Sequence, residues 1–300
     1  MTAPRQVLPG STYMVTRRCS ERRFFLRPSE LVNQVFTYCL AYAAQRTGVL
    51  IHSWVAMSNH WHAVLTDPHA RLPEFMECIN KLVGKCINAH LGRWESLWSS
   101  EHFSAVRLET DETVMAKLLY TLANPLQDEL VESWSQWPGA ISGPRACASR
   151  AVEVRRPTVF FRDAGQMPKS VRLEATVPPC FGDAKKHSFA ARLARRLEAR
   201  EAELREELVA KGRKLLGREA VLAQDPFDRP KSFEPRRGLN PRVACADKWR
   251  RVEALSRLKA FLEAYRRARE AFVSGKRNVE FPAGTYWLRR HAGCKAASPG

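Results

Sequence analysis

The sequence predicts an α+β protein, in which a ferredoxin-like antiparallel sheet with helices on one side precedes a mostly helical, basic extension. Two observations predict this fold. In the first 140 residues the spacing of the apolar residues predicts a strand, a helix, two strands, a helix and a strand, in that order. This is the order of elements in a split β-α-β layer. The rest of the chain carries the excess of basic side chains and two long stretches of charged, helical periodicity.

Each element of the first part has a local signal. Strands are expected where β-branched and aromatic residues gather, at residues 12–17, 49–56, 60–65 and 103–108. Helices are expected where apolar residues recur every three or four positions, at residues 29–47, 72–91 and 110–124. Ser29 is a candidate N-cap, and Gly48 ends the first helix. The third helix is expected to stop near Asn124-Pro125, and another helical turn or two between Leu126 and Trp134 stays open. The connection between the second and third strands is very short, so a tight hairpin and one bent strand both remain open.

The strongest chemical signal is the pair His60 and His62. Successive side chains of a strand point to opposite faces, so the two imidazoles share one face and Trp61 points to the other. Histidine is a common ligand of divalent metals, and this strand presents two such ligands side by side. The alternative is a pair of polar residues on the outer face of a half-buried strand.

The third predicted helix offers a nucleophile and a third ligand. Tyr120 and Asn124 are four residues apart, so both project from one helix face. If that face lies against His60 and His62, two imidazole nitrogens and one amide oxygen surround a metal and leave positions open for substrate oxygens. If phosphate oxygens fill the open coordination positions, the site suits Mg²⁺ or Mn²⁺. The histidine ligands alone also suit zinc. Taken alone, Tyr120 is better explained as an amphipathic core residue, and only the conjunction favours catalysis.

The charge is distributed unevenly along the chain. Residues 1–140 hold 13 basic and 13 acidic side chains, which leaves 36 basic and 18 acidic ones for residues 141–300 and accounts for the net charge of +18. A basic half beside a neutral half favours a polyanion partner, above all nucleic acid. The alternative is a solubilising tail.

Four arginines cluster at the exit of the first strand, at Arg17, Arg18, Arg22 and Arg23. Arginine offers a planar fork of donors that suits phosphate, so these residues are candidate DNA contacts. An exposed charged turn explains them equally well.

Composition also bears on location and organisation. No apolar run is long enough to span a membrane, and the N-terminus lacks the apolar core of a signal peptide, so the cytoplasm is the expected location. The eight cysteines form no C-x-x-C pair and are expected as free thiols. We expect a catalytic domain at residues 1–140, a linker at 141–184 and a basic, mainly helical extension at 185–300. A short strand is expected at 171–175, within the linker. The helices of the extension are expected at 185–216 and 247–273, separated by a proline-rich linker at 225–241.

The motif Met-Ser-Asn-His-Trp-His at residues 57–62, followed by Tyr-x-x-x-Asn-Pro at residues 120–125, resembles a known family. It is similar to the single-tyrosine transposases of small bacterial insertion sequences, within the His-hydrophobic-His (HUH) endonucleases. The similarity is greatest to their relatives associated with repetitive extragenic palindromes. The resemblance covers roughly residues 9–140, and residues 141–300 have no counterpart in it.

The resemblance implies a function and a set of roles. His60, His62 and Asn124 would hold the metal, although the family also uses glutamine at the third position. Tyr120 would be the nucleophile that forms a 5′-phosphotyrosine. The substrate would be single-stranded or hairpin DNA, and the enzyme would act as a monomer or a homodimer in DNA transposition. Two alternatives stay open, namely a domesticated DNA-binding protein without turnover and a nickase of the replication-initiator or relaxase type.

Overall fold

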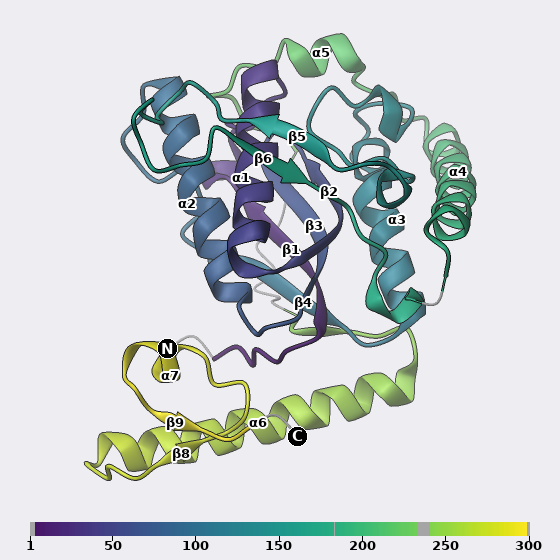
Figure 1. The fold of residues 1–300 in the computed structure, drawn as a ribbon. Helices are drawn as coiled ribbons and strands as arrows, with labels where there is room; N and C mark the ends of the chain where they lie inside the picture. The colour runs from purple at the N-terminus through teal and green to yellow at the C-terminus, as the bar shows by residue number, and fades with distance from the viewer. Residues whose placement is uncertain (1–3, 183, 233–240, 299–300) are drawn as a thin grey trace.

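The computed structural model of the chain describes residues 4–182, 184–232 and 241–298 (Figure 1). In this part of the chain the main sheet has five strands in the order β2-β3-β1-β4-β7. Their bounds are Ser11–Arg18 (β1), Leu50–Ala56 (β2), His60–Asp67 (β3), Ser104–Leu108 (β4) and Val243–Ala244 (β7). The first four pair antiparallel in the ferredoxin-like order, and β7 joins β4 in parallel. The predicted fold class is therefore confirmed.

Helices cover both faces of this sheet, whereas the sequence predicted them on one side only. α1 (Glu30–Thr47) and α2 (Leu72–Leu91) pack together on one face, while α3 (Asp111–Gln127) lies against β2 and β3 on the other (Figure 1). α4 (Lys186–Ala210) packs on α3 from outside. Because α3 follows the β-α-β-β-α-β order, it closes the sheet face that the first two helices leave open.

The central strand β3 is buried along its whole length. Trp61 points to the α1 side, where its ring meets the Phe36 ring at a centroid distance of 5.8 Å. The face that carries His60 and His62 is covered as well, so the alternative of two polar residues on the outer face of a half-buried strand is wrong. β2 and β3 form a tight hairpin, with Ala56 paired to Trp61.

Local signals explain where the first helix begins and ends. The Ser29 hydroxyl accepts the backbone N–H of Val32 at 3.2 Å, as an N-cap does. Gly48 adopts φ +75°, a left-handed conformation that glycine reaches without strain, and its N–H donates to the Ala44 carbonyl at 2.8 Å. Both predictions for this helix are confirmed.

α3 does not stop at Pro125 but continues to Gln127, within the helical continuation that the sequence left open for residues 126–134. Proline fixes φ near the helical value and removes only its own N–H donor. The next residues keep the helical pattern, since Asp128 N–H donates to the Asn124 carbonyl at 2.9 Å. The chain then leaves the helix, and only a 3₁₀ turn at Trp134–Gln136 follows.

Residues 141–182 pack on the first part of the chain. β5 (Val152–Arg155) and β6 (Ser170–Leu173) form an antiparallel hairpin that lies on α1 (Figure 1). The Tyr38 hydroxyl donates to the Pro168 carbonyl at 2.6 Å, and Thr176 N–H donates to the Ile51 carbonyl at 2.7 Å. A strand near β6 was expected from the sequence, whereas β5 was not.

The basic extension adds further elements. These are α4, which ends at Ala210 rather than at 216, α5 (Arg218–Leu222), α6 (Lys248–Val273), β8 (Glu280–Phe281), α7 (Trp287–His291) and β9 (Lys295–Ala296). Of the expected linker at 225–241, residues 233–240 lie outside the described residues. α6 and the short elements after it form a separate layer below the sheet (Figure 1). None of the helices in the described ranges is long and apolar enough to cross a membrane.

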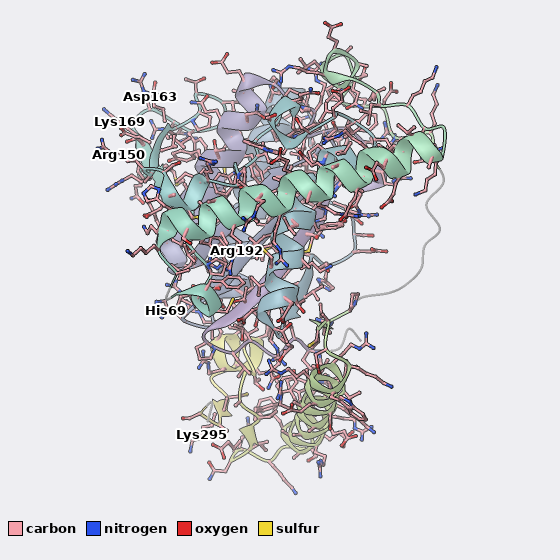
Figure 2. All side chains as sticks on the ribbon, turned by 90° about the vertical axis from the view of Figure 1, so that its right-hand side faces the viewer. His69, Arg150, Asp163, Lys169, Arg192 and Lys295 are labelled. Carbon is pink, nitrogen blue, oxygen red and sulfur yellow. The ribbon has the colours of Figure 1, made fainter. Side chains whose placement is uncertain are left out.

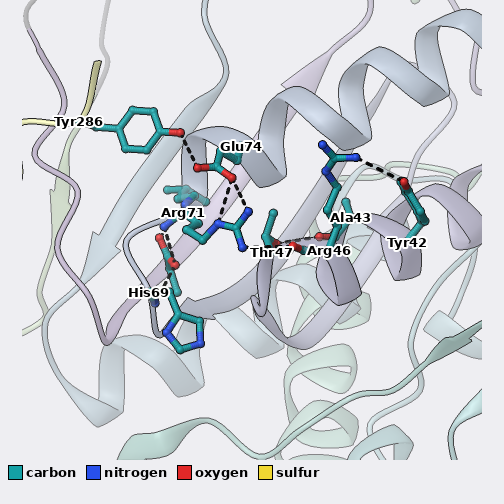
Figure 3. Close-up of polar contacts among 10 residues, drawn as sticks. Tyr42, Ala43, Arg46, Thr47, His69, Arg71, Glu74 and Tyr286 are labelled. Atoms are coloured by element: carbon teal, nitrogen blue, oxygen red, sulfur yellow. Dashed lines mark hydrogen bonds and ion pairs between the residues drawn. The ribbon is translucent and has the colours of Figure 1, made fainter. Parts of the chain in front are cut away.

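A polar contact ties this last layer to the rest of the molecule (Figure 3). The Tyr286 hydroxyl donates to Glu74 Oε1 at 3.0 Å, and Arg71 donates to Glu74 Oε2 through Nε at 2.9 Å. Since Arg71 and Glu74 belong to the start of α2, this contact joins α2 to the segment that leads into α7. The domain boundaries at 140 and 184 stay a prediction.

Candidate active site

β3 brings the two predicted histidine ligands together. His60 and His62 lie two residues apart on the sheet face toward α3, and their ring centroids are 4.7 Å apart. In the neighbouring strand β1, Arg18 is opposite His60 and Thr16 is opposite His62. The pairing register therefore decides which β1 side chains border the histidines.

Hydrogen bonds at Nδ1 orient both rings. His60 Nδ1 lies 2.6 Å from the Asn59 amide oxygen, which only accepts, so Nδ1 is the donor, and in the neutral ring Nε2 carries the lone pair. His62 Nδ1 lies 2.7 Å from the Thr16 hydroxyl, and when that oxygen accepts, His62 has the same tautomer. Partners of this kind at the second nitrogen are common for histidines that bind metals.

The surroundings keep His62 neutral. Burial is the main cause that lowers its pKa well below the usual 6.5, and the nearby positive groups His60, Arg18 and Lys117 lower it further. His62 is only 6% exposed. A neutral imidazole keeps a lone pair at neutral pH, as a metal ligand requires.

α3 places Tyr120 directly against this pair. The Tyr120 and His62 ring centroids are 5.5 Å apart, with the rings nearly perpendicular at 79°. Lys117, one turn earlier on α3, holds its Nζ 5.3 Å from the Tyr120 ring centroid. A phenol, two imidazoles and an ammonium thus share one region between β3 and α3.

Asn124 lies one turn after Tyr120 and is 1% exposed. Its side-chain oxygen is buried without a hydrogen-bond partner in the described part of the chain. An unpaired buried carbonyl is destabilising, so such an atom indicates that something else satisfies it in the working protein. Within the described ranges no three His, Cys, Asp or Glu side chains cluster as metal ligands. A ligand set of His60, His62 and Asn124 therefore depends on this amide, and its chemistry fits a divalent metal.

The four predicted arginines have different surroundings. Arg18 lies beside His60 in the sheet, and its charge reaches His62. Arg17 instead donates to the backbone carbonyls within residues 99–101. Of these two, only Arg18 borders the candidate site.

The other two arginines contact the chain itself. Arg22 donates to the Ser232 carbonyl at 2.7 Å, and Arg23 donates to the Phe227 carbonyl at 2.7 Å. Arg23 also forms an ion pair with Glu21 at 2.8 Å. They hold the segment that precedes the undescribed residues, and a role in DNA binding stays a prediction for all four arginines.

Sequence reasoning missed two neighbours of the site. Thr16 has no motif of its own, and only the register between β1 and β3 reveals it. Lys117 is detectable in the sequence, because it is three residues before Tyr120 and so shares its helix face.

Comparisons with known proteins are weak for this chain. No protein-family model matches it, and no curated protein matches it either. Among solved structures it is similar to a REP-associated tyrosine transposase bound to a REP hairpin. The two are 17% identical, the match covers 58% of this chain and 99% of the other, and the TM-score is 0.42. It is also similar to a candidate transposase from Deinococcus radiodurans R1, at 18% identity, 41% and 97% coverage and a TM-score of 0.30. TM-scores this low decide nothing about function, which has to be argued from the site.

Proposed function

We propose that the protein is a transposase that nicks and rejoins single-stranded DNA through Tyr120. One observation carries the proposal: the Tyr120 ring lies against His62, on the buried face that His60 shares. A phenol with no chemical role needs no pair of oriented imidazoles beside it. The basic excess of residues 141–300 supports DNA as the substrate.

The chain's own residues define the covalent step. A Tyr120 oxygen lone pair attacks the phosphorus of the scissile phosphodiester, and the phenol proton is lost to solvent. The P–O3′ bond breaks, its electron pair goes to the 3′ oxygen, and this oxygen takes a proton to become a free hydroxyl. The product is a 5′-phosphotyrosine ester. Attack by another 3′-hydroxyl reverses the step and joins the strands without ATP, since the ester keeps the bond energy.

Nε2 of His60, Nε2 of His62 and Oδ1 of Asn124 are the atoms that would hold the divalent metal, which we propose to be Mg²⁺ or Mn²⁺. When bound, the ion would polarise the phosphate and offset the negative charge of the transition state. Lys117 and Arg18 add positive charge close to the same place. This supports an anionic substrate, because a phosphate is attracted to such a region.

The test is the covalent adduct itself. The full chain is incubated with labelled, hairpin-bearing single-stranded DNA and Mn²⁺ or Mg²⁺, and adducts are separated under denaturing conditions. We expect an adduct with the wild type and none with Tyr120→Phe. Tyr42→Phe is the matched control and should form the adduct, because Tyr42 lies on α1 beside Arg46 and away from the site (Figure 3). If the wild type binds this DNA but forms no adduct, the protein is a DNA-binding protein without turnover.

A further inference from the structure

A cavity of about 680 Å³ lies outside the candidate active site. Its walls come from α4, the β5–β6 hairpin and the segment at residues 133–150. The walls are largely apolar and include two indoles, several serines and four charged groups, namely Glu201, Glu198, Arg145 and Arg150. Volumes of this size and a lining of this kind are typical of small-molecule sites.

Glu201 is the most informative of the polar groups. It is 5% exposed, although it lies on a helix whose surface is highly charged. Its Oε1 accepts the Trp134 backbone N–H at 2.7 Å, and the residue lines the cavity. Burial raises the pKa of this carboxyl above its usual range. A ligand that donates to the carboxylate would remove this cost.

The other lining residues suit a flat, anionic ligand. A Cβ placed on Gly143 would come within 3.1 Å of the Trp134 ring, so this indole packs directly on the backbone of the loop. Trp134 is half-buried and borders the cavity. Arg145 and Arg150 are exposed at its rim, and Figure 2 shows Arg150 on the face that α4 crosses.

We propose that this cavity binds an unpaired guanine of the DNA strand, which deepens the proposed function and rests on it. Guanine presents N1–H and N2–H side by side, and a carboxylate accepts both at once. Adenine and cytosine place a ring acceptor beside their amino group, and thymine offers one N–H between two carbonyls. Glu201 therefore selects guanine, Trp134 offers a face for stacking, and the two arginines take the adjoining phosphate.

Mononucleotides test the cavity without cleavage. Binding of dGMP, dIMP, dAMP, dCMP and dTMP to the full chain is followed by calorimetry and tryptophan fluorescence. We expect dGMP to bind tightest. dIMP should bind at least about tenfold more weakly, because it lacks the N2 amino group and leaves a buried acceptor unpaired. Equal affinity for dGMP and dAMP would overturn the proposal, as would no binding of any nucleotide.

Variants then assign the effect to the carboxylate. Glu201→Gln keeps an oxygen for Trp134 N–H, so the fold should persist, and thermal unfolding checks this. We expect Glu201→Gln to weaken the binding of dGMP at least tenfold. Glu206→Gln, at an exposed position on the same helix, should leave the affinity for dGMP unchanged. Ala194→Phe, which fills the cavity from the same helix, should also abolish dGMP binding. Unchanged dGMP affinity in both cavity variants would contradict the assignment.

The two proposals can fail separately. Tyr120→Phe should bind dGMP like the wild type, because Tyr120 does not line the cavity. An adduct at Tyr120 without any preference for guanine over inosine in the oligonucleotide would overturn the cavity proposal alone. Selective dGMP binding without an adduct would overturn the nicking proposal alone.

Discussion

At the scale of single residues, Asn124 is a candidate metal ligand whose unpaired side-chain oxygen lowers the stability of the fold. Its buried amide oxygen has no partner among the described residues, although neighbouring α3 side chains pack in the core. A buried acceptor left unpaired costs about 1–3 kcal/mol. The proposed metal, if bound at Asn124, would pair this oxygen and remove that cost.

Asn124→Leu should therefore separate the two effects. We expect the free energy of unfolding without metal to rise by about 1 kcal/mol, because an apolar side chain of similar size replaces the unpaired amide. The stabilisation that Mn²⁺ gives the wild type should be lost. Thermal unfolding with and without Mn²⁺ measures both. Gln127→Leu, on the last turn of the same helix and exposed, is the control and should keep the metal response.

His52 is a buried histidine that links three segments. Its Nε2 lies 2.8 Å from the Thr66 hydroxyl, and its Nδ1 lies 3.0 Å from the Thr176 carbonyl. Burial lowers the pKa of His52 to about 4 from 6.5, despite the hydrogen bond to Thr176. The folded protein keeps this ring neutral at a pH where the unfolded chain would protonate it.

The sign of the resulting pH dependence follows directly. Between pH 6.5 and 4 the unfolded state binds the extra proton, so stability is full above pH 6.5 and falls as the pH drops toward 4. At about 1.4 kcal/mol per pKa unit, His52 should account for a loss of about 3 kcal/mol. Urea unfolding of the wild type and of His52→Gln at several pH values isolates the contribution of His52 to the pH dependence of stability. Parallel curves for the two proteins would contradict it.

At the scale of elements, α2 depends on a cap that lies outside the helix. The Asp67 carboxylate, at the end of β3, accepts the backbone N–H groups of His69 at 3.2 Å, Arg71 at 2.9 Å and Leu72 at 2.6 Å. It is fully buried. A negative group at a helix N-terminus is favourable, and here it also joins the helix to the central strand.

Asp67→Ala should lower the free energy of unfolding by about 3 kcal/mol, because three N–H groups lose a charged acceptor. Chemical denaturation measures the change. Asp163→Ala is the control and should leave the stability nearly unchanged, since Asp163 is fully exposed and water screens its 3.8 Å ion pair with Arg156. A similar small effect at Asp67 would show that the cap is dispensable.

Elements with strong local signals were predictable. Ser29 and Gly48 give the ends of α1, and the order of strands and helices gives the sheet. β5 was not predictable, because four residues reading Val-Glu-Val-Arg form a strand only through pairing with β6. Pro125 misled because its effect depends on position, and near the end of α3 it costs a single hydrogen bond.

The candidate site was predictable to the same degree. The two histidines and Tyr120 follow from periodicity, since strand and helix spacing put each on a known face. The position of Thr16 at the site does not follow from periodicity, because it depends on which β1 residue pairs with His62. The hydrogen-bond partners of Arg22 and Arg23 were not predictable either, because they lie about two hundred residues away in the sequence.

At the scale of the whole molecule, the excess positive charge lies outside the part of the chain that forms most of the main sheet. The first 140 residues are neutral and contain the candidate site, while the remainder carries the excess of 18 positive charges. α6 presents many of them in a layer of its own (Figure 1). Its surface also has an exposed indole, since Trp249 is 76% exposed. This layer is therefore suited to holding DNA outside the site.

The last prediction concerns this layer. Four arginines of α6 are exposed, namely Arg250, Arg251, Arg266 and Arg267. If each contacts a phosphate, changing all four to glutamine should weaken single-stranded DNA binding and flatten its salt dependence. The slope of log K against log salt should shrink by roughly 0.7 per lost contact, or about 3 in all.

Fluorescence anisotropy across a salt series gives both slopes. The matched control replaces the same four residues with lysine, which keeps the charge, so the slope should stay near that of the wild type. Because counterion release depends on the number of neutralised phosphates, the slope reports contacts where affinity alone does not. An unchanged slope in the glutamine variant would mean that α6 serves only solubility and that DNA is held elsewhere in the basic half.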